Sequence, residues 1–155
     1  MTKSLILSSF VLCFLALASS THVDFEDCGK GKATSTIAFV DITPCDKQPC
    51  TLKRGTEETM EVQFTPHKAI TAAKTIVHGK LPYLPVQLPF PVDNPDACKD
   101  QGIECPMAAG KTYTFKTVLP IKSMYPTTPV IVTWEMKDQD NNLVYCWQIA
   151  AQIEG

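Results

Sequence analysis

The chain has 155 residues with a formal net charge of −2, and 45% of its residues are hydrophobic. This length allows one domain with a substantial core but not two, and the slightly acidic balance argues against nucleic acid as a partner. The sequence contains no low-complexity tract, repeat or linker, so a single folded unit is expected.

The first twenty residues are typical of a secretory signal peptide. Lys3 precedes an apolar stretch from Leu5 to Leu17, and small residues occupy positions 18–20. Serines interrupt the apolar run, and it is shorter than the about 20 residues that cross a bilayer, which argues against a membrane anchor. We therefore expect residues 1–20 to be removed, leaving one secreted domain over residues 21–155 with a net charge of about −3.

Alternating apolar residues predict β-strands along the rest of the chain. Strands are expected over 34–42, 58–64, 71–79, 111–119, 129–136 and 143–153, with a polar turn at 137–142. No stretch keeps a helical period over three turns. The pattern predicts an all-β, immunoglobulin-like antiparallel β-sandwich of about seven strands. Its expected inward residues include Met60, Val62, Phe64, Tyr113, Phe115, Thr117, Leu119, Val130, Val132, Trp134 and Met136.

Cysteine spacing favours one set of disulfides. Six cysteines remain after Cys13 leaves with the signal peptide, and an even number in a secreted chain predicts three disulfides. Cys45–Cys50 and Cys98–Cys105 are each spaced like a clip across a turn, which leaves Cys28 to pair with Cys146. A metal site is disfavoured because no CxxC pair or histidine cluster accompanies the cysteines.

The segment LPYLPVQLPFPVDNPDAC, residues 81–98, is apolar yet carries five of the twelve prolines. Proline cannot donate to a ladder, so this segment is expected at an edge of a sheet. Its apolar side chains either form a plug that completes the core or line a mouth where the sheets part for an apolar ligand. Composition leaves both interpretations open.

Groups capable of catalysis are scattered along the sequence. His22, His67 and His78 lie far apart, and no GxSxG, HExxH or phosphate-binding glycine loop occurs. Glu57, Glu58 and Glu61 are interpreted as a solvated strand face. The sequence therefore predicts neither an enzyme nor a bound cofactor or metal.

Six motifs occur in the order seen in a known lipid-binding family. They are VDFEDCG at 23–29, TPCDKQPC at 43–50, VHG at 77–79, PFPV at 89–92, LPIK at 119–122 and NLVYCWQ at 142–148. This ordered set, with all six cysteines, closely resembles the ML-domain lipid-recognition family over essentially the whole mature chain. The resemblance implies the same three disulfides and an apolar cavity between the sheets that holds one lipid, with no enzymatic step.

The resemblance also assigns residues to the cavity. Its mouth falls on Phe90, Ile121 and Tyr125. Its walls include Leu88, Leu119, Val132, Trp134 and Trp147. The segment from Gly79 to Phe90 is slightly longer than in sterol-binding members, which makes Gln87 and Lys80 candidates for a polar rim.

Two classes of function fit this resemblance. The first is a secreted, monomeric carrier of one sterol, long-chain fatty acid or similar signalling lipid (a semiochemical), which it releases at a membrane or membrane receptor. The alternative is a recognition module, like the family's endotoxin co-receptor, in which the bound lipid completes a protein–protein surface. The chain lacks an N-x-Ser/Thr sequon, so extracellular fluid is expected, with the lysosomal lumen as the alternative.

Overall fold

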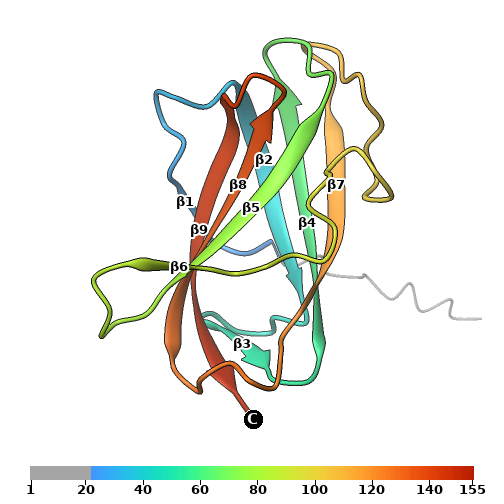
Figure 1. Cartoon of the computed structure of the whole chain (residues 1–155). Helices are drawn as coiled ribbons and strands as arrows, with labels where there is room; N and C mark the ends of the chain where they lie inside the picture. Colours follow the sequence, from blue (N-terminus) through green and yellow to red (C-terminus); the bar gives the residue numbers. More distant parts are fainter. Residues whose placement is uncertain (1–21) are drawn as a thin grey trace, which may run out of the picture.

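The fold is a sandwich of two β-sheets (Figure 1), seen in a computed structural model that describes residues 22–155. The described residues contain nine strands and no α-helix. The strands are β1 (Glu26–Asp27), β2 (Ser35–Thr43), β3 (Cys50–Lys53), β4 (Glu57–Pro66), β5 (Ala73–Lys80), β6 (Gln87–Pro89), β7 (Tyr113–Pro120), β8 (Pro129–Asp138) and β9 (Leu143–Glu154). The expected signal peptide lies outside the described residues.

The smaller sheet has the order β2-β4-β7, and the larger has the order β1-β9-β8-β5-β6. These neighbours are antiparallel, whereas β3 pairs with β9 in parallel, Cys50 lying opposite Ala151. The predicted immunoglobulin-like β-sandwich is therefore confirmed, and it contains one parallel pair that the alternation of apolar residues does not predict. The six predicted strands correspond to β2, β4, β5, β7, β8 and β9, while the short β1, β3 and β6 were missed as strands.

The core lies between the sheets and is built on aromatic rings. Trp134 of β8 is opposite Trp147 of β9, and their rings stack with centroids 5.6 Å apart. Phe115 approaches Trp134 edge-on from the facing sheet, at 6.4 Å. Each large apolar side chain buried in this way contributes about 1.5–3 kcal/mol of transfer free energy. The two Trp residues are thus central to the packing of one sheet on the other.

The structure forms three disulfides, and they are the pairs that the resemblance implies. Cys28–Cys146 joins residues 118 apart in sequence, whereas Cys45–Cys50 and Cys98–Cys105 join residues 5 and 7 apart. The first bond ties the chain just after β1 to the first part of β9, and the backbone N–H of Cys28 donates to the Cys146 carbonyl at 3.1 Å. This bond closes most of the domain into one loop.

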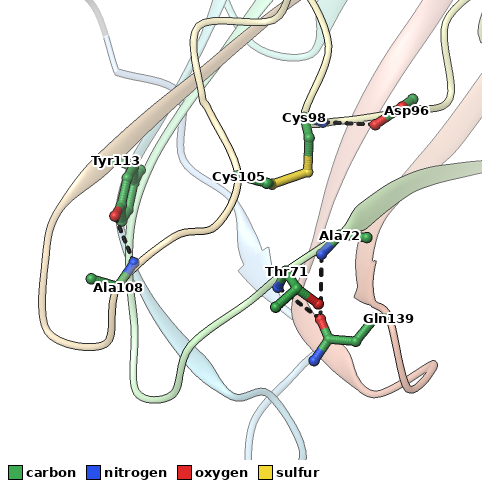
Figure 2. The surroundings of a disulfide bond; sticks show 8 residues. All are labelled: Thr71, Ala72, Asp96, Cys98, Cys105, Ala108, Tyr113 and Gln139. Carbon is green, nitrogen blue, oxygen red and sulfur yellow. Dashed lines mark hydrogen bonds between the residues drawn. A yellow bond between two sulfur atoms is a disulfide. The ribbon is translucent and has the colours of Figure 1, made fainter.

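Short hydrogen bonds fix the loops around the third disulfide (Figure 2). The Asp96 carboxylate accepts from the Cys98 backbone N–H at 3.0 Å, and the Tyr113 hydroxyl accepts from the Ala108 backbone N–H at 2.7 Å. The Gln139 side-chain oxygen accepts from the Thr71 backbone N–H at 3.0 Å. The loops at the end of the sandwich where β4 finishes and β7 begins are therefore tethered.

Candidate functional site

The opposite end of the sandwich carries Ile121, just after β7. Its backbone N–H donates to the Thr56 carbonyl at 2.9 Å, and its carbonyl accepts from the Gly55 backbone N–H at 2.6 Å. Only 1% of Ile121 is exposed. Pro120, which has no N–H, ends β7 immediately before it, so the regular ladder stops where the predicted mouth begins.

Phe90 and Tyr125 come together from two separate proline-flanked segments. Their ring centroids are 4.7 Å apart, in a tilted arrangement. The Phe90 backbone N–H donates to the Val77 carbonyl at 2.8 Å, which holds the segment after β6 against β5. A Cβ added to Gly79 would lie 3.8 Å from the Phe90 ring and 3.2 Å from the Val130 side chain, so glycine leaves room for both.

Arg54, in the turn between β3 and β4, tethers the segment that carries Tyr125. One guanidinium nitrogen (Nη1) donates to the Tyr125 carbonyl at 3.3 Å and to the Ser123 carbonyl at 3.4 Å. Burial raises the pKa of the Tyr125 phenol, and the nearby Asp93 charge adds to this increase. The ring at the predicted mouth is therefore fixed through its backbone, while its hydroxyl oxygen is buried without a hydrogen-bond partner in the described chain.

The predicted wall residues fall into two groups. Four lie deep in the continuous core between the sheets, each no more than 1% exposed: Leu119, Val132, Trp134 and Trp147. The indole N–H groups of Trp134 and Trp147 have no hydrogen-bond partner within residues 22–155. Leu88 lies apart from this group, on β6, and is 39% exposed. The structure therefore does not place Leu88 with the inward residues.

The proline-rich segment lies at the edge of the larger sheet, as its prolines predict. Its strand β6 is last in the strand order and pairs only with β5, placing Gln87 opposite Lys80 and Leu88 opposite Gly79. Both polar rim candidates, Gln87 and Lys80, are exposed. In Figure 1 the loop between β5 and β6 projects from the body of the sandwich.

The interpretation of Glu58 as a solvated residue is wrong. Glu58 is 1% exposed and lies on the inward face of β4 in phase with Met60, Val62 and Phe64. Its Oε2 atom has no hydrogen-bond partner in the part of the chain that the structure describes, and burial raises the pKa of the carboxyl from 4.5 to about 7. The alternation of β4 predicts this position, because Glu58 comes two residues before Met60 and so falls on the same face of the strand. Glu57 is exposed, and Glu61 pairs with Lys116 at 3.7 Å.

The histidines form no common site. The His22 ring bonds Asp41 at 2.6 Å, the His67 ring bonds Thr36 at 2.8 Å, and His78 lies on β5. Within the described residues no group of three or more His, Cys, Asp or Glu side chains could hold a metal ion. Over the same residues no helix is long and apolar enough to cross a membrane.

A surface hollow of about 670 Å³ lies away from the predicted mouth. Cys98 is part of its lining, which also includes the charged side chains of Lys99, Asp100 and Glu104. An open, charged hollow is a poor environment for an apolar molecule, because lipid binding depends on the removal of apolar surface from water. The interior between the sheets remains the better candidate.

Known proteins are similar to this chain in both sequence and fold. The family model described as the ML domain matches residues 22–153. The chain is 40% identical over 144 residues to NPC intracellular cholesterol transporter 2 of Bos taurus, covering 91% of this chain and 93% of that protein. It is 37% identical to the homolog a of that transporter in Drosophila melanogaster, covering 93% and 96%. The crystal structure of a Niemann-Pick type C2 protein from the Japanese carpenter ant matches with a TM-score of 0.77 and 26% identity, covering 85% of this chain and 100% of that one.

Proposed function

The chain belongs to the ML-domain family, and from this we propose that it is a carrier that binds one hydrophobic lipid between its two sheets. The observation that carries the proposal is the packing of the Phe90 ring on the Tyr125 ring, four residues after buried Ile121, against a sandwich interior that is apolar and aromatic. The names of the bovine and fly relatives make a sterol the first ligand to test. A long-chain fatty acid or a similar signalling lipid is the second.

Apolar burial supplies the driving force for binding. Removal of roughly 300 Å² of lipid surface from water gains several kcal/mol at about 25 cal/mol per Å², before the costs of ordering. Four of the predicted wall side chains, Leu119, Val132, Trp134 and Trp147, belong to one continuous buried cluster. In this proposal the lipid enters as the sheets part between them. No bond in the lipid is made or broken in this function, and we propose that the protein is not an enzyme.

Phe90 and Tyr125 form the entrance in this proposal. Both rings are carried on segments interrupted by proline, Phe90 between Pro89 and Pro91 and Tyr125 before Pro126. A side chain on such a segment is not held by ladder hydrogen bonds on both sides. The two rings therefore move aside at a lower free-energy cost than the Trp pair on β8 and β9.

The carrier releases its lipid at a membrane or membrane receptor. The β5–β6 loop exposes Tyr83 (62%) and Val86 (57%), and Met124, which precedes Tyr125 in the sequence, is 81% exposed. Exposed apolar groups of this kind are suited to an apolar partner surface. We propose that residues 1–20 are a signal peptide and that the mature monomer acts in extracellular fluid, with the lysosomal lumen as the alternative.

Native mass spectrometry of the protein recovered from the secretory route tests the carrier function. A complex with one bound lipid is expected, and cholesterol added to lipid-stripped protein should rebind in the same ratio. Binding of neither cholesterol nor a long-chain fatty acid would overturn the proposal.

Phe90→Ala should weaken cholesterol binding about 10- to 100-fold, equivalent to roughly 1–3 kcal/mol of lost aromatic burial. It should destabilise the lipid-free protein by less than the about 3–5 kcal/mol typical of a core Phe→Ala change, because the entrance is not locked into a sheet. Titration with cholesterol and urea unfolding of the lipid-free variant measure the two effects.

Val86→Ala is the matched control, because Val86 lies in the same proline-rich segment but is 57% exposed. It should leave the cholesterol affinity and the free energy of unfolding close to those of the unchanged protein. Full core-like destabilisation by Phe90→Ala with unchanged affinity would show that the ring is a plug, and the entrance would have to be sought elsewhere.

A further inference from the structure

Glu58 lies near the start of β4, on the sheet that β4 forms with β7. It is opposite Leu119 in the β4–β7 register, and Leu119 is fully buried. Two residues beyond Leu119 is Ile121, whose backbone bonds the residues immediately before β4. Glu58 therefore belongs to the same end of the sandwich as the entrance, where the polar end of an otherwise buried lipid would be found.

Among residues 22–155 the carboxyl of Glu58 has no charge partner. On its own strand, Glu57 is exposed and Glu61 pairs with Lys116 of β7. The charged residues Asp46, Lys47 and Lys53 share with Glu58 the lining of a hollow of about 400 Å³. None of them offsets the burial of Glu58, since burial alone accounts for its raised pKa.

The surroundings on the inner side are apolar or aromatic. Neighbouring inward positions on β7 and after it are Leu119 and Ile121, and the central strands of the larger sheet contribute Val132, Trp134 and Trp147. The titratable side chains of the hydrophobic cluster are the phenols of Tyr125, at the entrance, and of Tyr113 and Tyr145, which both pack on Phe64 at the other end of β4. A buried carboxyl oxygen without a partner costs about 1–3 kcal/mol or more, and a ligand hydrogen bond would recover part of it.

We propose that Glu58 binds the polar head of the lipid and selects a hydroxyl head over a carboxylate head. This inference rests on the proposed carrier function and adds to it the chemical class of ligand. A hydroxyl group fits both protonation states of Glu58, because it donates to the carboxylate and can also accept from the protonated acid. A carboxylate head is repelled by ionised Glu58 and binds only when a proton lies between the two groups.

The preferred ligands are therefore sterols and long-chain alcohols, and fatty-acid anions bind less well at neutral and alkaline pH. The exposed rim candidates Lys80 and Gln87 lie on β5 and β6 of the larger sheet, whereas Glu58 lies on β4 of the smaller sheet. Glu58 would therefore give the lipid a polar contact separate from that rim. Selection by Glu58 is a property of this buried position and does not require the exposed rim.

Hexadecanol and hexadecanoate test the proposal, because they have the same chain and differ in the head group. Both are titrated against the lipid-stripped mature protein at about pH 8.5, where a carboxyl with a pKa of about 7 is ionised. The unchanged protein should prefer hexadecanol. Glu58→Gln should reduce the ratio of the two dissociation constants about tenfold, because an amide repels no anion and can donate to a carboxylate.

Two further variants separate the head-group contact from general effects on the fold. Glu57→Gln changes the exposed neighbour and should leave the ratio unchanged. Glu58→Leu removes both hydrogen-bonding functions and should weaken hexadecanol binding about tenfold. Leucine should also stabilise the fold at this buried position, so a loss of affinity cannot be explained by unfolding. At about pH 5.5 the unchanged protein should lose most of its preference, because protonated Glu58 can donate to hexadecanoate.

The outcomes distinguish this inference from the carrier function. If the unchanged protein binds neither hexadecanol, hexadecanoate nor cholesterol, the carrier function fails, and the inference fails with it. If the lipids bind but Glu58→Gln and Glu58→Leu leave the head-group ratio and the hexadecanol affinity unchanged, the assignment of Glu58 is wrong and the carrier function stands.

Discussion

Replacement of Cys28 and Cys146 by serine should lower the free energy of unfolding by about 5 kcal/mol, the largest loss that we expect from any one disulfide. The bond closes a loop with a sequence separation of 118, so it removes more conformational freedom from the unfolded chain than the short clips do. The same chain-entropy relation gives about 2 kcal/mol for Cys45–Cys50, with a separation of 5. Urea unfolding of the two double-serine variants, both free of lipid, measures the difference.

The Cys45→Ser, Cys50→Ser variant is the matched control, since it also removes one buried sulfur pair and adds two hydroxyls. Equal losses in the two variants would contradict the entropic explanation and would place the stabilisation in local packing. A smaller loss for the long loop than for the short clip would mean that the unfolded chain retains contacts between its ends.

The free energy of unfolding should fall by up to about 3 kcal/mol as pH rises from about 4.5 to about 7, because of Glu58 alone. Below this window the carboxyl is protonated in both states. Within it the unfolded chain releases the proton while the folded chain keeps it, since the folded pKa is the higher one. The unfolded state is thus favoured increasingly until the folded carboxyl also ionises, and the effect is constant above that point.

Glu58→Gln should remove this part of the pH dependence and be more stable than the unchanged protein at about pH 8, by up to about 3 kcal/mol. Glu57→Gln controls for the loss of one negative charge, because Glu57 is exposed. Urea unfolding across the pH range gives the profiles. A Glu58→Gln profile parallel to that of the unchanged protein would show that Glu58 titrates normally.

The all-β architecture, the inward residues of the long strands and the edge position of the proline-rich segment were available from the sequence. These features depend on local rules. Alternation in β4 and β8 determines which side chains share a face, and the prolines of residues 81–98 prevent pairing on both sides. The ordered motifs also indicated the family, because cysteines and prolines at fixed spacings leave few alternative arrangements.

Other features were decided by the tertiary structure, because they depend on partners distant in sequence. The parallel pairing of β3 with β9 joins residues about a hundred positions apart, and no local pattern specifies it. Leu88 is apolar like Phe90, yet it is exposed, because β6 is an edge strand and has a neighbouring strand, β5, on one side only. Its position could not be derived from its residue type.

Glu58 shows most clearly how the two sources of information differ. A glutamate side chain is usually exposed to solvent, but the alternation of β4 puts Glu58 on the same buried face as Met60 and Val62. In a paired strand, alternation fixes the direction of every side chain once its neighbours on one face are buried. The packing of β4 against the opposite sheet therefore outweighs the preference of the Glu58 carboxyl for solvent. That burial left the Oε2 atom of Glu58 without a hydrogen-bond partner among residues 22–155.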